Sequence, residues 1–334
     1  DGVDWFAPTR NYGGPLGLQR LVDAAHQHRL GVLLDVVYNH FGPEGNYLRQ
    51  FSPAYFTNRY RTPWGDAINY EGCPFARELA IDNACSWLRD YHIDGLRLDA
   101  TFAIHDSSPK HLLVELAESV RSQSPRAILI AETHENDVRY LQPLNEGGRG
   151  FDAVWADDFH HVVRRLLAGD HEGYYQDYTG TVDELARTLS QGFLYEGQRS
   201  PSSGGPRGTV ARDRPASQFV YCIQNHDQVG NRAFGDRLTQ GLGPDAYRLA
   251  SALLLLAPCT PMLFMGQEFA ASSPFLYFTD HPPELGKLVT EGRRSEFASF
   301  SAFQDPDARE HIPDPQAEQT FLASKLRWPE AENS

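Results

Sequence analysis

The sequence predicts a parallel α/β fold, and more specifically a (β/α)₈ barrel. Apolar segments of strand length alternate with amphipathic helices along the 334 residues. Strands that are apolar on both faces and separated by helices form parallel sheets. Polar residues follow four of these strands, at Asn39-His40, Asp99, Glu132 and His226-Asp227. Periodicity alone also allows a doubly wound sheet, but a site built from many strand ends is typical of the barrel.

Each element has its own signal. Gly31 breaks the first amphipathic helix before an apolar strand, Pro109 fits the first turn of a helix, and Thr181-x-x-Glu184 is a capping box. The expected helices are 18–28, 78–91, 108–122, 158–167, 181–189 and 245–256. The expected strands are 32–37, 93–99, 127–131, 152–155, 219–224 and 261–265. A closed barrel needs two strands more than these.

Two connections are longer than a compact domain usually contains. Residues 41–73 hold many aromatics and turn formers, so we expect a compact excursion over the site. Residues 195–218 are rich in Gly, Ser, Pro and Arg, a composition typical of a mobile surface loop.

Composition excludes several kinds of partner. The net charge of −14 argues against nucleic acid and anionic membranes. The longest apolar run, around 252–257, is far too short to span a bilayer. The four cysteines form no C-x-x-C pair, which makes a zinc site unexpected and favours a reducing compartment such as the cytoplasm. The chain opens at Asp1 in what we interpret as a loop, so we expect its natural beginning to lie further upstream.

Asp99 and Glu132 are the strongest candidates for chemistry. They lie 33 residues apart, about one βα unit, which places them at the ends of adjacent strands. Two carboxyl groups there can flank one glycosidic bond, one attacking the anomeric carbon and the other protonating the leaving oxygen. Arg97, on the same strand face as Asp99, would keep the nucleophile ionised. The alternative is a pair of salt bridges at the rim of the barrel.

Other candidates are weaker when taken singly. His40 and the pair His226-Asp227 could hold sugar hydroxyls, although such residues also favour turns. Trp64, Trp155 and Tyr277 could stack on sugar rings, as could Phe275 and Phe278, although aromatic side chains more often belong to the core. We expect Asp35 to be structural, and His160-His161 to lie on a helix surface or rim.

Four runs, in this order and spacing, resemble the four signature regions of the α-amylase superfamily of glycoside hydrolases. They are Asp35-Val-Val-Tyr-Asn-His40, Gly95-Leu-Arg-Leu-Asp99, Ile130-Ala-Glu132 and Gln224-Asn-His-Asp227. The resemblance implies Asp99 as nucleophile, Glu132 as acid/base and Asp227 as third carboxylate. It also implies that the sugar in the −1 subsite is supported by His40, Arg97 and His226.

A finer resemblance, over nearly the whole chain, is to the maltooligosyltrehalose trehalohydrolases. Its runs are 39–47, 61–66, 157–161, 224–231, 275–281 and 292–297. That family cleaves the α-1,4 bond next to the trehalose end of its substrate, and the resemblance implies no metal or cofactor. The expected ligand is maltooligosyltrehalose or a related α-glucan. Gln267 stands where the family usually has Glu, and Thr101 and Thr133 are also departures, which concern fine specificity.

The resemblance also implies a domain plan and leaves rivals. Residues 1–300 would form an α-amylase-type barrel that lacks its first two strands, with a β-sandwich upstream, and 301–334 would lead to a C-terminal β-domain. The rival functions are a glycogen branching enzyme, which transfers α-1,4 chains to α-1,6 positions, and a non-catalytic carbohydrate-binding protein. This chain keeps all three carboxylates, whereas a binding protein is expected to lose one or more. A further alternative is that a fragment of this length is inert.

Overall fold

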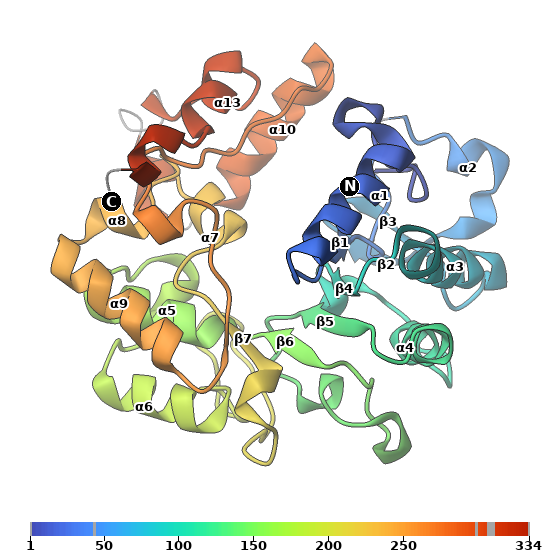
Figure 1. Ribbon diagram of the computed structural model, residues 1–334, viewed down its shortest axis with the longest axis horizontal. Coiled ribbons are helices and arrows are strands. Elements are labelled where there is room, and N and C mark those ends of the chain that lie inside the picture. The colour runs from blue at the N-terminus through green and yellow to red at the C-terminus, as the bar shows by residue number, and fades with distance from the viewer. Residues whose placement is uncertain (1, 43–44, 298–299, 306–310, 333–334) are drawn as a thin grey trace. The chain divides into compact units, whose positions relative to one another are not determined.

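The computed structural model describes residues 2–42, 45–297, 300–305 and 311–332, and forms two compact units. Unit 1 covers Asp1–Trp155 and unit 2 covers Ala156–Ser334 (Figure 1). Asp1, Pro43, Glu44 and Asn333-Ser334 lie outside the described residues, so expectations that fall on them stay predictions. The expected division at residue 300 also stays a prediction.

Unit 1 is built on a parallel sheet with the order β1-β4-β5-β6. Its strands are β1 (Leu33–Val36), β4 (Gly95–Leu98), β5 (Ile128–Glu132) and β6 (Ala153–Trp155). Its main helices are α1 (Gly14–Gln27), α3 (Pro74–Tyr91) and α4 (Leu112–Gln123). Leu96, Leu98 and Leu129 are fully buried between sheet and helices. This is the predicted alternation of strand and helix.

The excursion after β1 contains a small antiparallel hairpin. Helix α2 (Leu48–Phe51) precedes strands β2 (Phe56–Thr62) and β3 (Gly65–Ile68), which pair with each other. The 3₁₀ turns of unit 1 are Arg10–Tyr12, Pro53–Tyr55, Thr101–Ala103, Val138–Tyr140 and Leu144–Glu146.

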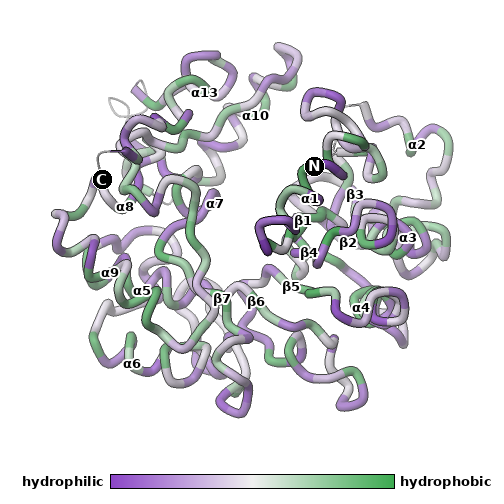
Figure 2. Tube along the Cα trace, in the orientation of Figure 1, coloured by the Kyte–Doolittle hydropathy of each residue, from purple (hydrophilic) through white to green (hydrophobic). Residues whose placement is uncertain are grey.

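Unit 2 is mostly helical around two short parallel strands, β7 (Phe219–Tyr221) and β8 (Thr260–Pro261). Its helices are α5 (Asp157–Ala168), α6 (Val182–Gln191), α7 (His226–Gly230), α8 (Leu238–Gly241), α9 (Pro244–Leu256), α10 (Pro283–Glu296), α11 (Ser301–Gln304) and α13 (Glu318–Ser324). Its 3₁₀ turns are Gly173–Asp177, Ala216–Gln218, Gln267–Phe269 and Trp328–Glu332. Figure 2 shows apolar and polar residues alternating along α5 and α6, as expected of helices with one buried face.

Several local predictions were wrong in detail. Helices α1 and α3 begin four residues earlier than expected, and β7 ends at Tyr221 rather than at residue 224. Helix α4 begins at Leu112, not at Ser108, because the Asp106 carboxylate accepts from the backbone N–H groups of Ser108 and Leu112 and holds the intervening turn open. The last strand is two residues long because Pro261 has no N–H for the ladder. The capping box is only half formed, since Thr181 accepts from Glu184 N at 3.2 Å while Glu184 binds Thr179 N and Gly180 N.

The segment 195–218 is largely exposed, as expected of a surface loop, and is tied to unit 2 by buried polar contacts; its mobility stays a prediction. Arg207 donates to Asp158 and to the hydroxyl of Tyr178, at 3.1 and 3.0 Å, and Asp158 is fully buried on α5. Asp177 accepts hydrogen bonds from Ser200 and Ser202. Polar residues of the segment, which suggested a solvent-exposed loop, therefore bind buried side chains of unit 2.

Two other expectations concern buried side chains. All four cysteines are free and buried. His160 and His161, expected on a helix surface, are only 1% and 6% exposed, so that prediction was wrong. Both rings pack among Tyr175 and neighbouring tyrosines. No helix in the described ranges has the length and apolar character needed to cross a membrane.

Candidate active site

The ends of strands β4 and β5 bring the two predicted catalytic carboxylates to the same edge of the sheet. Leu98 is in register with Ala131, so Asp99 and Glu132 leave neighbouring strands at the same level. The Asp99 N–H donates to Val36 O at 2.9 Å, which continues the pairing with β1 by one residue. Their side chains are 25% and 18% exposed. Both can therefore be reached by a ligand while remaining fixed by the sheet.

A single guanidinium, that of Arg97, contacts both carboxylates. Nη1 donates to Asp99 Oδ1 at 2.9 Å, and Nη2 forms an ion pair with Glu132 Oε2 at 2.7 Å. Nη1 also donates to both oxygens of Asp35, at 2.6 and 2.7 Å. Asp35 is thus paired with an arginine, in keeping with the structural role predicted for it. Burial opposes the charge on Arg97, but Glu132, Asp35 and Asp99 outweigh it and raise the pKa of the guanidinium above its ordinary value.

Further hydrogen bonds fix the geometry around Asp99 and Glu132. Asn39 Nδ2 donates to Asp99 Oδ2 at 3.1 Å, and the Ala100 N–H donates to Glu132 Oε2 at 2.8 Å. Thr101, one of the residues that depart from the family pattern, donates through Oγ1 to the carbonyl of Glu132 at 2.6 Å. Its hydroxyl therefore helps to fix the end of β5. Ala100 has φ +38°, a strained conformation for a residue with a Cβ. Sequence reasoning assigned no role to Asn39, although it directly precedes His40 at a strand end.

His40 and Trp64 form a stacked pair beside this cluster. Their ring centroids lie 4.4 Å apart with the planes 8° from parallel. His40 is 3% exposed, whereas Trp64 is 40% exposed and sits at the turn of the β2–β3 hairpin. Desolvation lowers the pKa of His40 to about 4 despite the opposing charge of Asp99, so the imidazole is neutral near pH 7. A neutral ring can hydrogen-bond a sugar hydroxyl, and the exposed indole offers a flat apolar face.

Trp155 has a different environment from the other predicted aromatics. The guanidinium of Arg97 lies 3.9 Å from the centroid of the Trp155 ring, a cation–π contact. Trp155 ends β6 in register with Glu132 on β5. The ring supports the arginine that holds both carboxylates, and its contact with sugar stays a prediction.

His226, Asp227 and Tyr277 belong to unit 2, so their roles beside Asp99 stay predictions. Asp227 is in the first turn of α7, which the Asn225 side chain caps by accepting from Gln228 N at 2.8 Å. His226 Nε2 lies 3.6 Å from Asp227 Oδ1, and both side chains are nearly half exposed.

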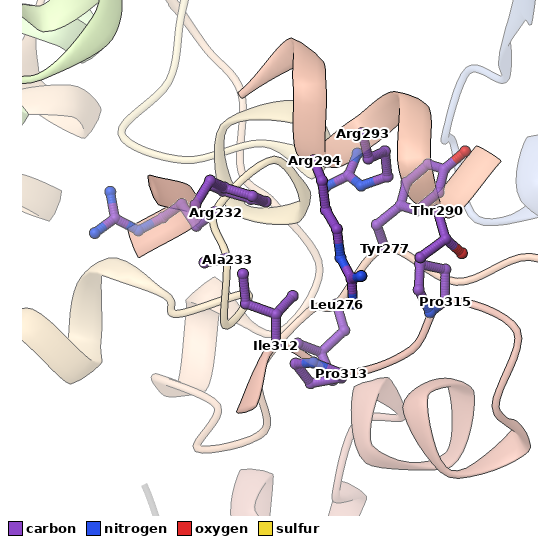
Figure 3. Close-up of a pocket in the computed structure, with 11 residues that line it drawn as sticks. Arg232, Ala233, Leu276, Tyr277, Thr290, Arg293, Arg294, Ile312, Pro313 and Pro315 are labelled. Atoms are coloured by element: carbon purple, nitrogen blue, oxygen red, sulfur yellow. The ribbon is translucent and has the colours of Figure 1, made fainter. Parts of the chain in front are cut away.

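The far end of α7 is held by Arg293. Its Nη2 donates to Gly230 O at 2.8 Å, and its Nη1 donates to Asn231 Oδ1 at 3.2 Å. The same guanidinium lies 3.8 Å from the ring centroid of Tyr277, and both residues line a small cavity (Figure 3). Within the described ranges, no group of three His, Cys, Asp or Glu residues could hold a metal ion.

Comparison with known proteins identifies the family. The chain is 49% identical over 334 residues to a malto-oligosyltrehalose trehalohydrolase of Deinococcus radiodurans, and 46% identical over 341 residues to that of Rhizobium sp.. These alignments cover 99% of the chain, and 54% and 56% of the relatives. The chain belongs to the malto-oligosyltrehalose trehalohydrolase family. It spans about half the length of the curated relatives it matches.

A solved structure supports the fold of this trehalohydrolase family member. A putative α-amylase of Salmonella typhimurium superposes with a TM-score of 0.91 at 44% identity, covering 99% of this chain and 56% of that one. The fold is therefore of the α-amylase (β/α)₈ type, as predicted, and the described residues contain six of its parallel strands. A branching enzyme of Oceanobacillus iheyensis matches only 45% of the chain, at 34% identity. A scan against family models found no match.

Proposed function

We propose that the protein is a retaining glycoside hydrolase that cleaves the α-1,4 bond next to the terminal trehalose of maltooligosyltrehalose. The observation that carries this proposal is the placement of Asp99 and Glu132 on adjacent strand ends, both in contact with Arg97. The names of the relatives point to the same substrate. The less extensive match to a branching enzyme favours hydrolysis over transfer to a glucan.

The mechanism assigns each carboxylate one role at a time. Asp99 attacks the anomeric carbon as Glu132 gives its proton to the glycosidic oxygen, which releases trehalose and leaves a glycosyl ester on Asp99. Glu132, now ionised, takes a proton from water, and the resulting hydroxide displaces Asp99 at the same carbon. Two inversions retain the configuration. Arg97 stabilises the ionised form of Asp99 in both steps.

Asp227, His226, His40 and the exposed Trp64 complete the proposal as substrate contacts. Asp227 would bind hydroxyl groups of the sugar that is distorted at the reacting carbon, with His226 beside it. His40 supplies a neutral imidazole and Trp64 an apolar face. Tyr277 and Trp155 are proposed as further aromatic contacts with the glucan.

The proposal is tested with the full-length protein and purified maltooligosyltrehalose. We expect Asp99→Asn and Glu132→Gln each to reduce trehalose release by at least about 10³-fold, while circular dichroism and the melting temperature stay close to wild type. Asp90→Asn and Glu118→Gln are matched controls, since both carboxylates are exposed and lie on helices. Full release by either active-site variant would refute the mechanism. New α-1,6 branches in place of trehalose would identify a branching enzyme instead.

A further inference from the structure

Unit 2 contains a second feature that the proposed mechanism does not use, a cavity beside helix α7. Its volume is about 400 Å³, within the usual range for small-ligand pockets. The neighbouring cavity shown in Figure 3 is only about 30 Å³, too small for an organic ligand. The larger cavity is formed by residues after α5, after α7 and at α11. They include Asp170, Glu172, Tyr174, Asn231, Phe234 and Phe300.

The aromatic wall of this cavity is built by close backbone packing. Gly173 has φ +57°, and a Cβ there would lie 2.4 Å from the Phe300 ring, so only glycine allows the ring to take this position. Phe300 meets Tyr174 edge to face, with centroids 5.6 Å apart. Phe234 adds a third ring, which is 41% exposed. The wall therefore offers apolar faces that solvent can reach.

The polar wall carries more acid than base. Arg232 donates to Asp236 Oδ2 at 2.6 Å and to Asp170 Oδ2 at 3.4 Å, so its charge is already shared. Figure 3 shows this guanidinium pointing away from the smaller cavity. Glu172 accepts from Ser301 N through Oε2. Within the described residues, Asp170 and Asp236 accept these bonds through Oδ2 and keep Oδ1 without a hydrogen bond, and Asn231 keeps its amide N–H groups.

These linings restrict the chemical class of ligand. An anion would meet the excess of carboxylates, and the described residues contain no cluster able to hold a metal ion. A sugar ring satisfies both walls, because its C–H face packs on aromatic rings and its hydroxyls donate to carboxylates and accept from an amide.

The position of the cavity close to Asp227 also favours a sugar. The Asn231 N–H donates to Asp227 O at 2.9 Å, so the cavity begins one helical turn after Asp227.

We infer that this cavity is a subsite for one or two glucosyl units of a neutral oligosaccharide, with Phe234 as its accessible platform. The inference rests on the proposed function, since it assigns the bound sugar to the same substrate. It adds a point of attachment for the glucan beside α7. Binding energy from a contact with non-reacting sugars can be used to position the reacting sugar.

The test measures sugar binding apart from turnover. The full-length protein carrying Asp99→Asn is titrated with trehalose and with maltotriose by isothermal calorimetry. Phe234→Ala in that background should weaken the binding of at least one of these sugars by about fivefold to tenfold. Phe234→Tyr should restore it. Phe321→Ala is the matched control, because Phe321 is 43% exposed but lies on α13 outside the cavity, and it should leave affinity unchanged.

Equal affinities for the Phe234→Ala and Phe321→Ala proteins, or no saturable binding of either sugar, would overturn the inference. The melting temperatures of the variants verify that each is folded, and Phe234→Leu, which keeps an apolar side chain but lacks the flat ring, replaces Phe234→Ala if that variant is unstable. The two proposals fail separately. If the wild-type protein releases trehalose but sugar binding does not depend on Phe234, only the subsite is refuted. If sugar binding depends on Phe234 but the wild-type protein releases no trehalose, only the proposed hydrolysis is refuted.

Discussion

Arg97 is the residue on which the proposed site depends most. Its guanidinium is planar and forked, so Nη1 and Nη2 can meet Asp99 and Glu132 at the same time while the flat face rests on Trp155. A lysine ammonium is a single point charge and cannot make this set of contacts. The residue is 5% exposed, so water cannot replace the contacts that are lost.

We expect Arg97→Lys to lower the rate of trehalose release on the order of 100-fold, because one carboxylate loses its partner and the other shifts. The assay is single-turnover release from maltooligosyltrehalose. Arg89→Lys is the control, since Arg89 is exposed on α3 and pairs with its neighbour Asp90. A wild-type rate for Arg97→Lys would show that charge alone, without the fork, is sufficient.

Among the elements, strand β4 has the least tolerance for change because Gly95 is packed between its neighbours. A Cβ on Gly95 would lie 2.3 Å from Ile128 O and 2.8 Å from Leu33 Cδ2. The strands on both sides would have to move apart. Asp99 follows this strand directly, so a shift in β4 also moves the proposed nucleophile.

Gly95→Ala should lower the free energy of unfolding by about 2 kcal/mol through overpacking, as measured by urea denaturation. Gly292 in α10 provides the comparison, since a Cβ there meets nothing within 4 Å. Gly292→Ala should be neutral or stabilise the helix by a few tenths of a kcal/mol. Equal stability of the two variants would contradict the packing argument.

The segment 195–218 owes its position to the buried Arg207–Asp158 ion pair. Removing one partner of a buried pair leaves an uncompensated charge, which costs about 3 kcal/mol. Arg207→Met should therefore reduce stability by roughly that amount and increase cleavage of the segment by subtilisin. Arg248→Met is the control, because Arg248 and its partner Asp245 are both exposed, and it should change stability by less than about 1 kcal/mol. Unchanged cleavage of the Arg207→Met protein would show that the segment is held by other contacts.

For the molecule as a whole, several buried neutral histidines predict loss of stability in acid. Burial lowers the pKa of His40 and His111 to about 4 and that of His161 to about 3. The unfolded chain binds these protons near pH 6.5, whereas the folded chain does not. Unfolding therefore takes up protons below that pH, and stability falls as the pH is lowered from about 6.5 towards 4. Asp106 and Asp137, whose pKa values are lowered by hydrogen bonds and arginines, act in the same direction at lower pH.

The pH effect is measured by urea denaturation between pH 7.5 and 5. In His161→Gln, the slope of the unfolding free energy against pH should decrease by up to about 1.4 kcal/mol per pH unit. This is the slope that corresponds to the uptake of one proton on unfolding. The comparison of slopes is unaffected by any packing loss in the variant. A parallel slope for wild type and His161→Gln would mean that His161 is protonated in the folded protein.

Much of the architecture follows from local sequence. The alternation of apolar runs and amphipathic helices predicted β1, β4, β5 and β6 to within two residues, because strand and helix periods are properties of short segments. The same patterns placed Asp99 and Glu132 at neighbouring strand ends. Two of the boundaries that failed, at α4 and β8, depend on a single group that the local pattern does not reveal. These groups are the Asp106 carboxylate and the missing N–H of Pro261.

The sequence by itself determined the family, the fold class and the identity of the candidate carboxylates, since these are carried by residue order and spacing. Only the tertiary structure decided that Arg97 contacts both carboxylates, that His160 and His161 are buried, and that Arg207 anchors 195–218. It alone revealed the cavity beside α7. Each of these depends on which side chains meet across elements far apart in the chain, and composition and periodicity contain no information on such contacts.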